Sequence, residues 1–105
     1  MERFRYVEIG LRNVRVRPLP DISAFEGRYR EYILNFVRTY EVPYVFRSYR
    51  DENNKFCCVL SIRSMRIFIE NIGETSSDVE KKTAYDLLNI YENRIFYNPY
   101  MHLSG

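Results

Sequence analysis

The chain has 105 residues, of which 46% are hydrophobic and 29% charged, and its net charge is +2. This length and apolar content predict one domain with a single core. The charged fraction and the lack of a long apolar run argue against a membrane span. The start Met-Glu-Arg-Phe-Arg-Tyr lacks the basic-then-apolar pattern of a secretory signal, so we expect a cytoplasmic or nuclear protein.

The basic residues are concentrated in the first half of the chain. Residues 1–50 carry ten arginines against six acidic residues, whereas residues 51–105 carry six basic and eight acidic residues. Arginine suits bidentate contacts to phosphate or carboxylate, but the overall balance is less basic than that of a strong nucleic-acid binder. The adjacent cysteines Cys57 and Cys58 would point to opposite faces of a strand, which favours buried thiols in a reducing compartment.

Period-two alternation over residues 1–17 predicts a short ribbon or an extended arm. The alternating apolar residues are Val7, Ile9, Leu11, Val14 and Val16. The polar pair Arg12-Asn13 separates the two halves of this pattern. The arginines of this segment either anchor nucleic acid or keep a sheet edge soluble. Prolines interrupt it at 18 and 20, so we expect an arm over 1–20, a domain over 21–96 and a tail over 97–105.

The next segment has the clearest helical pattern. Ser23 and Glu26 have the spacing of a capping box. The apolar residues that follow at steps of three or four are Ile22, Phe25, Tyr29, Ile33, Phe36 and Tyr40. They predict a helix over 22–40 that ends before Pro43, with Gly27 as its weak point.

Three strands are expected after this helix. Residues 44–50 and 55–63 are rich in aromatic and β-branched residues, and the polar run 51–54 between them predicts a hairpin turn. Met65, Ile67 and Ile69 then alternate with polar residues and Phe68, which predicts the third strand. Such a meander buries one face and leaves the other available.

A second amphipathic helix follows the strands. Ser77 and Glu80 repeat the capping-box spacing. The apolar stripe behind them consists of Ala84, Leu87, Leu88, Tyr91 and Ile95. The sequence therefore predicts an α+β domain of the order α-β-β-β-α, in which two helices cover one face of a three-stranded antiparallel sheet beside an N-terminal extended arm.

Over residues 22–95 the chain resembles the double-stranded RNA-binding domain (dsRBD) family. Lys81-Lys82-Thr83-Ala84 is similar to the lysine pair that opens the second helix of that family, and Pro43-Tyr44 to the start of its first strand. The resemblance implies a non-catalytic module in an RNA-related pathway. It would bind duplex RNA by shape, with the lysines on phosphates and with the first helix and the first hairpin loop in successive minor grooves.

On this resemblance, Lys81 and Lys82 are the expected phosphate contacts. The expected minor-groove contacts are Glu31, Asn35, Asn53, Asn54 and Lys55. The chain departs from the family by having Tyr85 in place of a third lysine, and a hairpin loop without histidine. The lysines also have acidic neighbours, which would weaken phosphate binding, and they fit equally well as solvated residues of a first helical turn.

The alternative function is protein–protein interaction or homodimerisation through the same fold. Val45, Tyr49, Val59 and Phe68 would gather on the sheet face that the helices leave open. An apolar patch of this kind rarely stays exposed on a monomer. It is expected to be covered either by the arm, through Val7, Ile9 and Leu11, or by a second protein.

An enzymatic function finds no support in the sequence. The single histidine, His102, lies in the irregular tail, and it cannot complete a tetrahedral metal site with Cys57 and Cys58. Four scattered glycines form no phosphate-binding loop. We therefore expect no catalytic or metal-binding residues, no cofactor and no small-molecule substrate.

Overall fold

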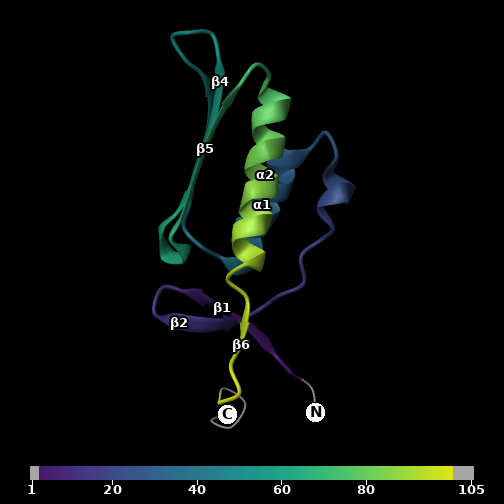
Figure 1. The fold of residues 1–105 in the computed structure, drawn as a ribbon, viewed down its shortest axis with the longest axis vertical. Helices are drawn as coiled ribbons and strands as arrows, with labels where there is room; N and C mark the ends of the chain where they lie inside the picture. The colour runs from purple at the N-terminus through teal and green to yellow at the C-terminus, as the bar shows by residue number, and fades with distance from the viewer. Residues whose placement is uncertain (1–2, 101–105) are drawn as a thin grey trace.

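The computed structural model describes residues 3–100 and shows an α+β domain with two α-helices and two three-stranded antiparallel sheets (Figure 1). In chain order the elements are β1 Arg5–Ile9, β2 Arg12–Arg15, the 3-10 helix η1 Ile22–Phe25, α1 Tyr29–Tyr40, β3 Val45–Arg50, β4 Phe56–Ile62, the 3-10 turn η2 Arg63–Met65, β5 Ile67–Gly73, α2 Ser76–Glu92 and β6 Phe96–Tyr97. The predicted succession of helix, three strands and helix is confirmed. Neither described α-helix is long and apolar enough to cross a bilayer.

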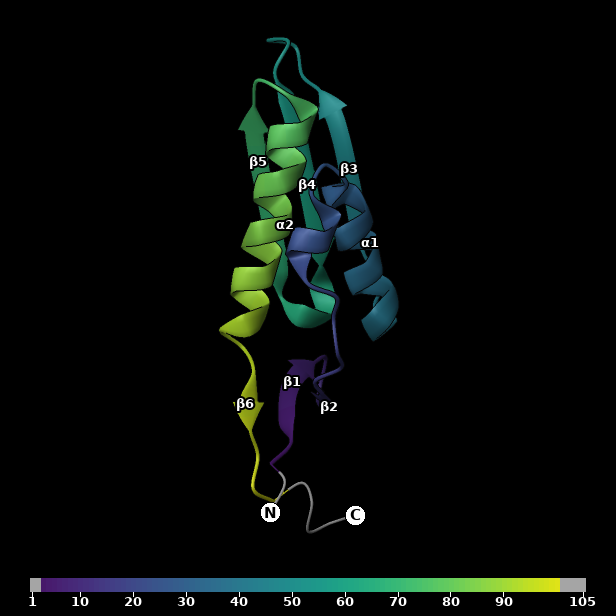
Figure 2. The same cartoon turned by 90° about the vertical axis from the view of Figure 1, so that its right-hand side faces the viewer.

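The main sheet has the strand order β3-β4-β5, and both α-helices lie on one side of it (Figures 1 and 2). Period-two alternation turns Leu60, Ile62, Ile67 and Ile69 toward the helices, where each is at most 5% exposed. Facing them across the core are buried helix residues, namely Tyr32, Ile33, Phe36, Val37, Ala84, Leu87 and Tyr91. Within residues 3–100, no helix lies on the opposite side of this sheet (Figure 1).

The turn between β3 and β4 is fixed by one side chain. Oδ1 of Asp51 accepts hydrogen bonds from the backbone N–H groups of Asn53 and Lys55, both at 2.9 Å. Asn54 adopts a left-handed conformation with φ +64°, which asparagine tolerates better than most residues. The expected hairpin turn over 51–54 is therefore confirmed.

The predicted helix over 22–40 is divided into two pieces. Residues 22–25 form the separate 3-10 helix η1, Gly27 then takes φ +76°, and α1 begins only at Tyr29. The capping box of Ser23 and Glu26 is wrong, because Asp21 caps η1 by accepting from the Ser23 N–H at 2.9 Å. The apolar residues of the two pieces still pack together, because η1 folds back on α1. The centres of the Phe25 and Tyr32 rings are 5.6 Å apart.

The start of α2 also differs from the predicted capping box. The helix begins at Ser76, and Thr75 is its N-cap, with Oγ1 accepting from the Asp78 N–H at 3.1 Å. Ser77 lies inside the first turn. Glu80 instead points toward the main sheet, where its carboxylate accepts from the Ser48 hydroxyl at 3.4 Å. The predicted pair of Ser77 and Glu80 is therefore wrong.

The N-terminal segment forms a second sheet of strand order β2-β1-β6 at one end of the domain (Figure 2). Its hairpin turns at Gly10-Leu11, with Gly10 at φ +63°, and residues 12 and 13 belong to β2. β6 pairs with β1, which the irregular appearance of the C-terminal sequence did not suggest. The Gly10 N–H donates to the Ser64 carbonyl at 2.6 Å, so this sheet joins the end of the main sheet. The expectation that it covers the open face is wrong.

Candidate functional site

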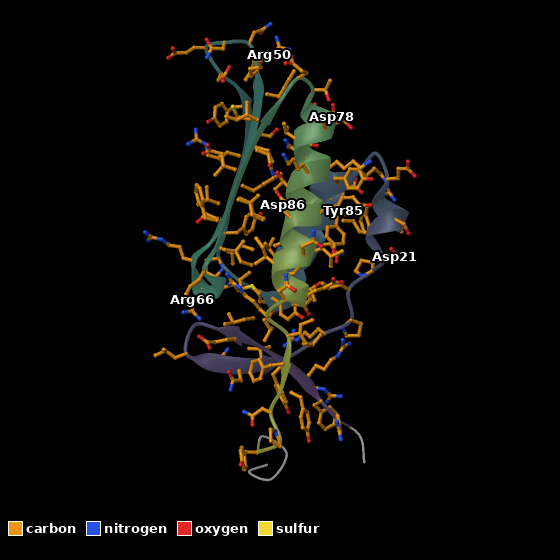
Figure 3. All side chains as sticks on the ribbon, viewed as in Figure 1. Asp21, Arg50, Arg66, Asp78, Tyr85 and Asp86 are labelled. Carbon is orange, nitrogen blue, oxygen red and sulfur yellow. The ribbon has the colours of Figure 1, made fainter. Side chains whose placement is uncertain are left out.

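Two of the segments expected to contact RNA, the β3–β4 turn and the start of α2, lie at one end of the domain (Figure 1). The β3–β4 turn and the start of α2 are adjacent there, as Figure 3 shows by the positions of Arg50 and Asp78. Arg30 of α1 approaches Glu80 of α2 with an N–O distance of 3.3 Å. Lys55 of the turn forms an ion pair with Glu74, just before α2. The fold thus brings the turn to the start of α2, and it holds the first turn of α1 against α2.

Electrostatically, this end is close to neutral. Lys81 and Lys82 are exposed in the first turns of α2, and neither takes part in an ion pair within the described part of the chain. Their amines add to the partial positive charge of the helix N-terminus. The acidic residues Glu74, Asp78 and Glu80, which we call the acidic rim, precede them in the chain, and Glu74 and Glu80 already neutralise basic groups of neighbouring elements. The surface offers two unpaired lysines beside the acidic rim.

The expected minor-groove residues differ in availability. Asn53 and Asn54 are exposed at the tip of the turn. Glu31 is exposed but pairs with Arg28 at 3.0 Å. Asn35 is half-buried, and its backbone carbonyl accepts from the Thr39 hydroxyl at 2.8 Å. The turn is therefore the freer of the two expected minor-groove elements.

The open face of the main sheet is a grid of three rows. The strand register aligns its outward side chains as Val45–Ser61–Phe68, Arg47–Val59–Glu70 and Tyr49–Cys57–Ile72. We call these the lower, middle and upper rows, the upper one being nearest the β3–β4 turn. Figure 3 shows side chains projecting from this side without a helix over them.

Large apolar side chains are exposed in the two outer rows. The exposed fractions are 67% for Phe68, 58% for Ile72, 53% for Val45 and 45% for Tyr49. Val59 is half-buried between its neighbours. The sequence pattern placed Val45, Tyr49, Val59 and Phe68 on this face, as the strand register does, but its third strand stopped before position 72. The period-two pattern, continued past position 70, would have placed Ile72 on this face.

The arm residues expected at the same interface lie elsewhere. Val7 is fully buried and belongs to the main core, while Ile9 packs against that core. Leu11 is fully exposed at the tip of the β1–β2 hairpin, beside the η2 turn. Val7 and Ile9 therefore stabilise the domain and do not form a surface.

Both cysteines are buried as thiols and lie on opposite faces of β4, as predicted. Burial is the main cause that raises the pKa of each thiol, and the Asp51 carboxylate raises the pKa of Cys57 further. Raised pKa values disfavour the nucleophilic thiolate. Within residues 3–100, no three His, Cys, Asp or Glu side chains lie close enough to share a metal ion.

An open hollow of about 800 Å³ lies where the 16–22 linker crosses the helices. Its lining mixes linker prolines with Tyr32 and Tyr91, and its charged residues include Arg5, Arg17 and Glu92. No pattern in the sequence pointed to it.

Comparison with known proteins leaves the function to be argued from the structure: no protein-family model, curated protein or solved structure matches the chain. Two surfaces are available for that argument, namely the helix end with its lysines and the open face of the main sheet.

Proposed function

We propose that this chain is a non-catalytic dsRBD-like module that binds double-stranded RNA weakly in an RNA-related pathway of the cytoplasm or nucleus. The observation that carries the proposal is that the β3–β4 turn lies beside the start of α2 at one end of the domain (Figure 1), and that the first turn of α1 contacts α2 through Arg30 and Glu80. The order α1-β3-β4-β5-α2 and the position of both helices on one side of the sheet support it further.

The expected contacts follow from the chemistry of each segment. Lys81 and Lys82, at a helix N-terminus, bind phosphates across the major groove, because both the ammonium groups and the helix dipole favour an anion there. The Asn53-Asn54 tip enters a minor groove and donates to 2′-hydroxyl and base-edge acceptors. The acidic rim opposes this binding, so its affinity is low and falls with added salt.

A duplex titration tests the proposal. We expect a 20-base-pair RNA duplex to bind at low salt, and K81E/K82E to abolish that binding. The control R12E/R63E makes the same change in net charge at the opposite end and keeps binding. The proposal is overturned if the wild type does not bind, or if K81E/K82E binds as well as the control.

A second candidate function is docking of a protein on the open sheet face. The specific observation is that four large apolar side chains are 45–67% exposed there, and neither an α-helix nor the N-terminal sheet covers them. Contiguous exposure of this kind marks interaction sites.

A further inference from the structure

The charges on the open face are confined to its middle row. Arg47 and Glu70 lie on the two outer strands, each in register with Val59 of the central strand. The Arg47 guanidinium lies 5.8 Å from the centre of the Tyr49 ring, which holds it along the face. Neither charge belongs to an ion pair within the described residues. Two strand spacings, about 10 Å, separate the two strands that carry them.

The open faces of two copies are complementary when one particular two-fold rotation relates them. A two-fold axis that runs parallel to β4, above Val59 and midway between two facing copies, places the partner's β5 opposite β3 and the partner's β3 opposite β5. Arg47 then faces the partner's Glu70, and Glu70 faces the partner's Arg47. Val45 meets the partner's Phe68, and Tyr49 meets the partner's Ile72. Each charge finds an opposite charge, and each apolar residue of the outer rows finds another apolar residue.

We propose that the open face of the main sheet binds a second copy of this chain, with the two-fold axis parallel to the strands. The proposal rests on the second candidate function and names its partner. Two sheets would pack face to face with the helices outermost, at the usual spacing of about 10 Å.

Charge selects this axis over the other two-fold arrangement. An axis across the strands would place Arg47 opposite the partner's Arg47, and Glu70 opposite the partner's Glu70. Like charges brought together in a partly desolvated interface repel, and such pairing is a common means of excluding a wrong arrangement. Only the axis along the strands turns both contacts into attraction.

The size of the face predicts a weak dimer. Three strands about 4.8 Å apart and six or seven residues long form a patch of about 14 by 23 Å. The total buried area then lies below about 1,200 Å², in the class of transient interfaces. We expect a dissociation constant in the micromolar to millimolar range. Cys57 of each copy would remain about 10 Å from its equivalent, too far for a disulfide.

Sedimentation equilibrium up to about 1 mM tests this arrangement. The wild type is expected to dimerise, and R47E and E70R are each expected to dimerise at least about tenfold more weakly, because each turns two attractive contacts into two repulsive ones. An equimolar mixture of R47E and E70R, or the double reversal R47E/E70R, restores association. R12E and E52R, charge reversals away from the face, leave it unchanged.

Two outcomes overturn the proposal. One is a wild type that stays monomeric up to about 1 mM, and the other is a dimer that neither single reversal weakens. Circular dichroism of each variant verifies folding. The broader docking function has its own readout: F68E should abolish capture of a partner by the immobilised chain. A monomeric wild type whose capture F68E removes therefore rejects the second copy but keeps the docking function.

Discussion

A buried pair of hydroxyl groups joins the two helices to the N-terminal linker. The substitution Tyr40→Phe should show how much this pair contributes to the free energy of unfolding. The Tyr40 hydroxyl is hydrogen-bonded to the Tyr91 hydroxyl and also accepts from the Arg17 backbone N–H at 3.0 Å. Both rings are at most 7% exposed. Removing the Tyr40 oxygen leaves the buried Tyr91 hydroxyl and the half-buried Arg17 N–H without their partner. An orphaned buried polar group costs about 1–3 kcal/mol.

We therefore expect Tyr40→Phe to lower the free energy of unfolding by about 2–3 kcal/mol, and Tyr91→Phe by only about 1 kcal/mol, since the Arg17 N–H keeps its acceptor in the latter. The double variant should cost no more than Tyr40→Phe alone, because it removes both hydroxyl groups. Urea unfolding followed by circular dichroism measures all three, with exposed Tyr100→Phe as a control within about 0.5 kcal/mol. Additive costs, or a larger loss for Tyr91→Phe, would refute the reasoning.

Three further predictions concern stability. Thr75→Ala should cost about 1 kcal/mol because it removes the cap of α2, whereas Ser77→Ala should change the midpoint of urea unfolding little. Gly27→Ala should cost about 1–2 kcal/mol, since a Cβ meets nothing there but φ is +76°; an unchanged thermal midpoint would contradict this. Burial raises the pKa of Tyr32 to about 12, and burial with the Tyr40 hydrogen bond raises the pKa of Tyr91. The folded state therefore holds these two protons more tightly than the unfolded state does. Their contribution to the free energy of unfolding is full below pH 10 and falls as pH rises toward 12. Tyr91→Phe should make the free energy of unfolding, measured by urea titration, fall less steeply over this pH range.

Local patterns predicted the strands and the main hairpin well. Alternation sets which side of a strand is buried, and Asp51 stabilises its own turn, so neither feature depends on distant residues. Helix starts were less predictable, because several nearby side chains can serve as a cap. Thr75 and Ser77 both carry a suitable hydroxyl, and the place where β5 ends decides between them. Gly27 was identified as a weak point, but nothing local showed that the chain would turn back there.

Features that depend on distant pairing were missed. β6 is two residues long and exists because β1, about ninety residues earlier, offers it an edge. The middle row of the open face has the same origin, since Arg47 and Glu70 become neighbours of Val59 only once two strand registers are known. The acidic rim before Lys81 was visible in the sequence, whereas the pairing of Lys55 with Glu74 required the structure.

The two proposed surfaces lie on opposite sides of the main sheet, so a dimer can form without hiding the lysines. A two-fold axis parallel to the strands points both copies the same way, and the two α2 starts then lie at one end of the dimer, roughly 30 Å apart across the four layers. A duplex long enough for both copies would be bound twice, and the second contact benefits from a high effective concentration. R47E weakens dimerisation but leaves the lysines intact. We therefore expect R47E to bind a 40-base-pair duplex more weakly than the wild type, and an equal amount of E70R to restore the affinity for that duplex. Equal affinity of R47E and wild type for that duplex, at concentrations where only the wild type dimerises, would show that the two surfaces act independently.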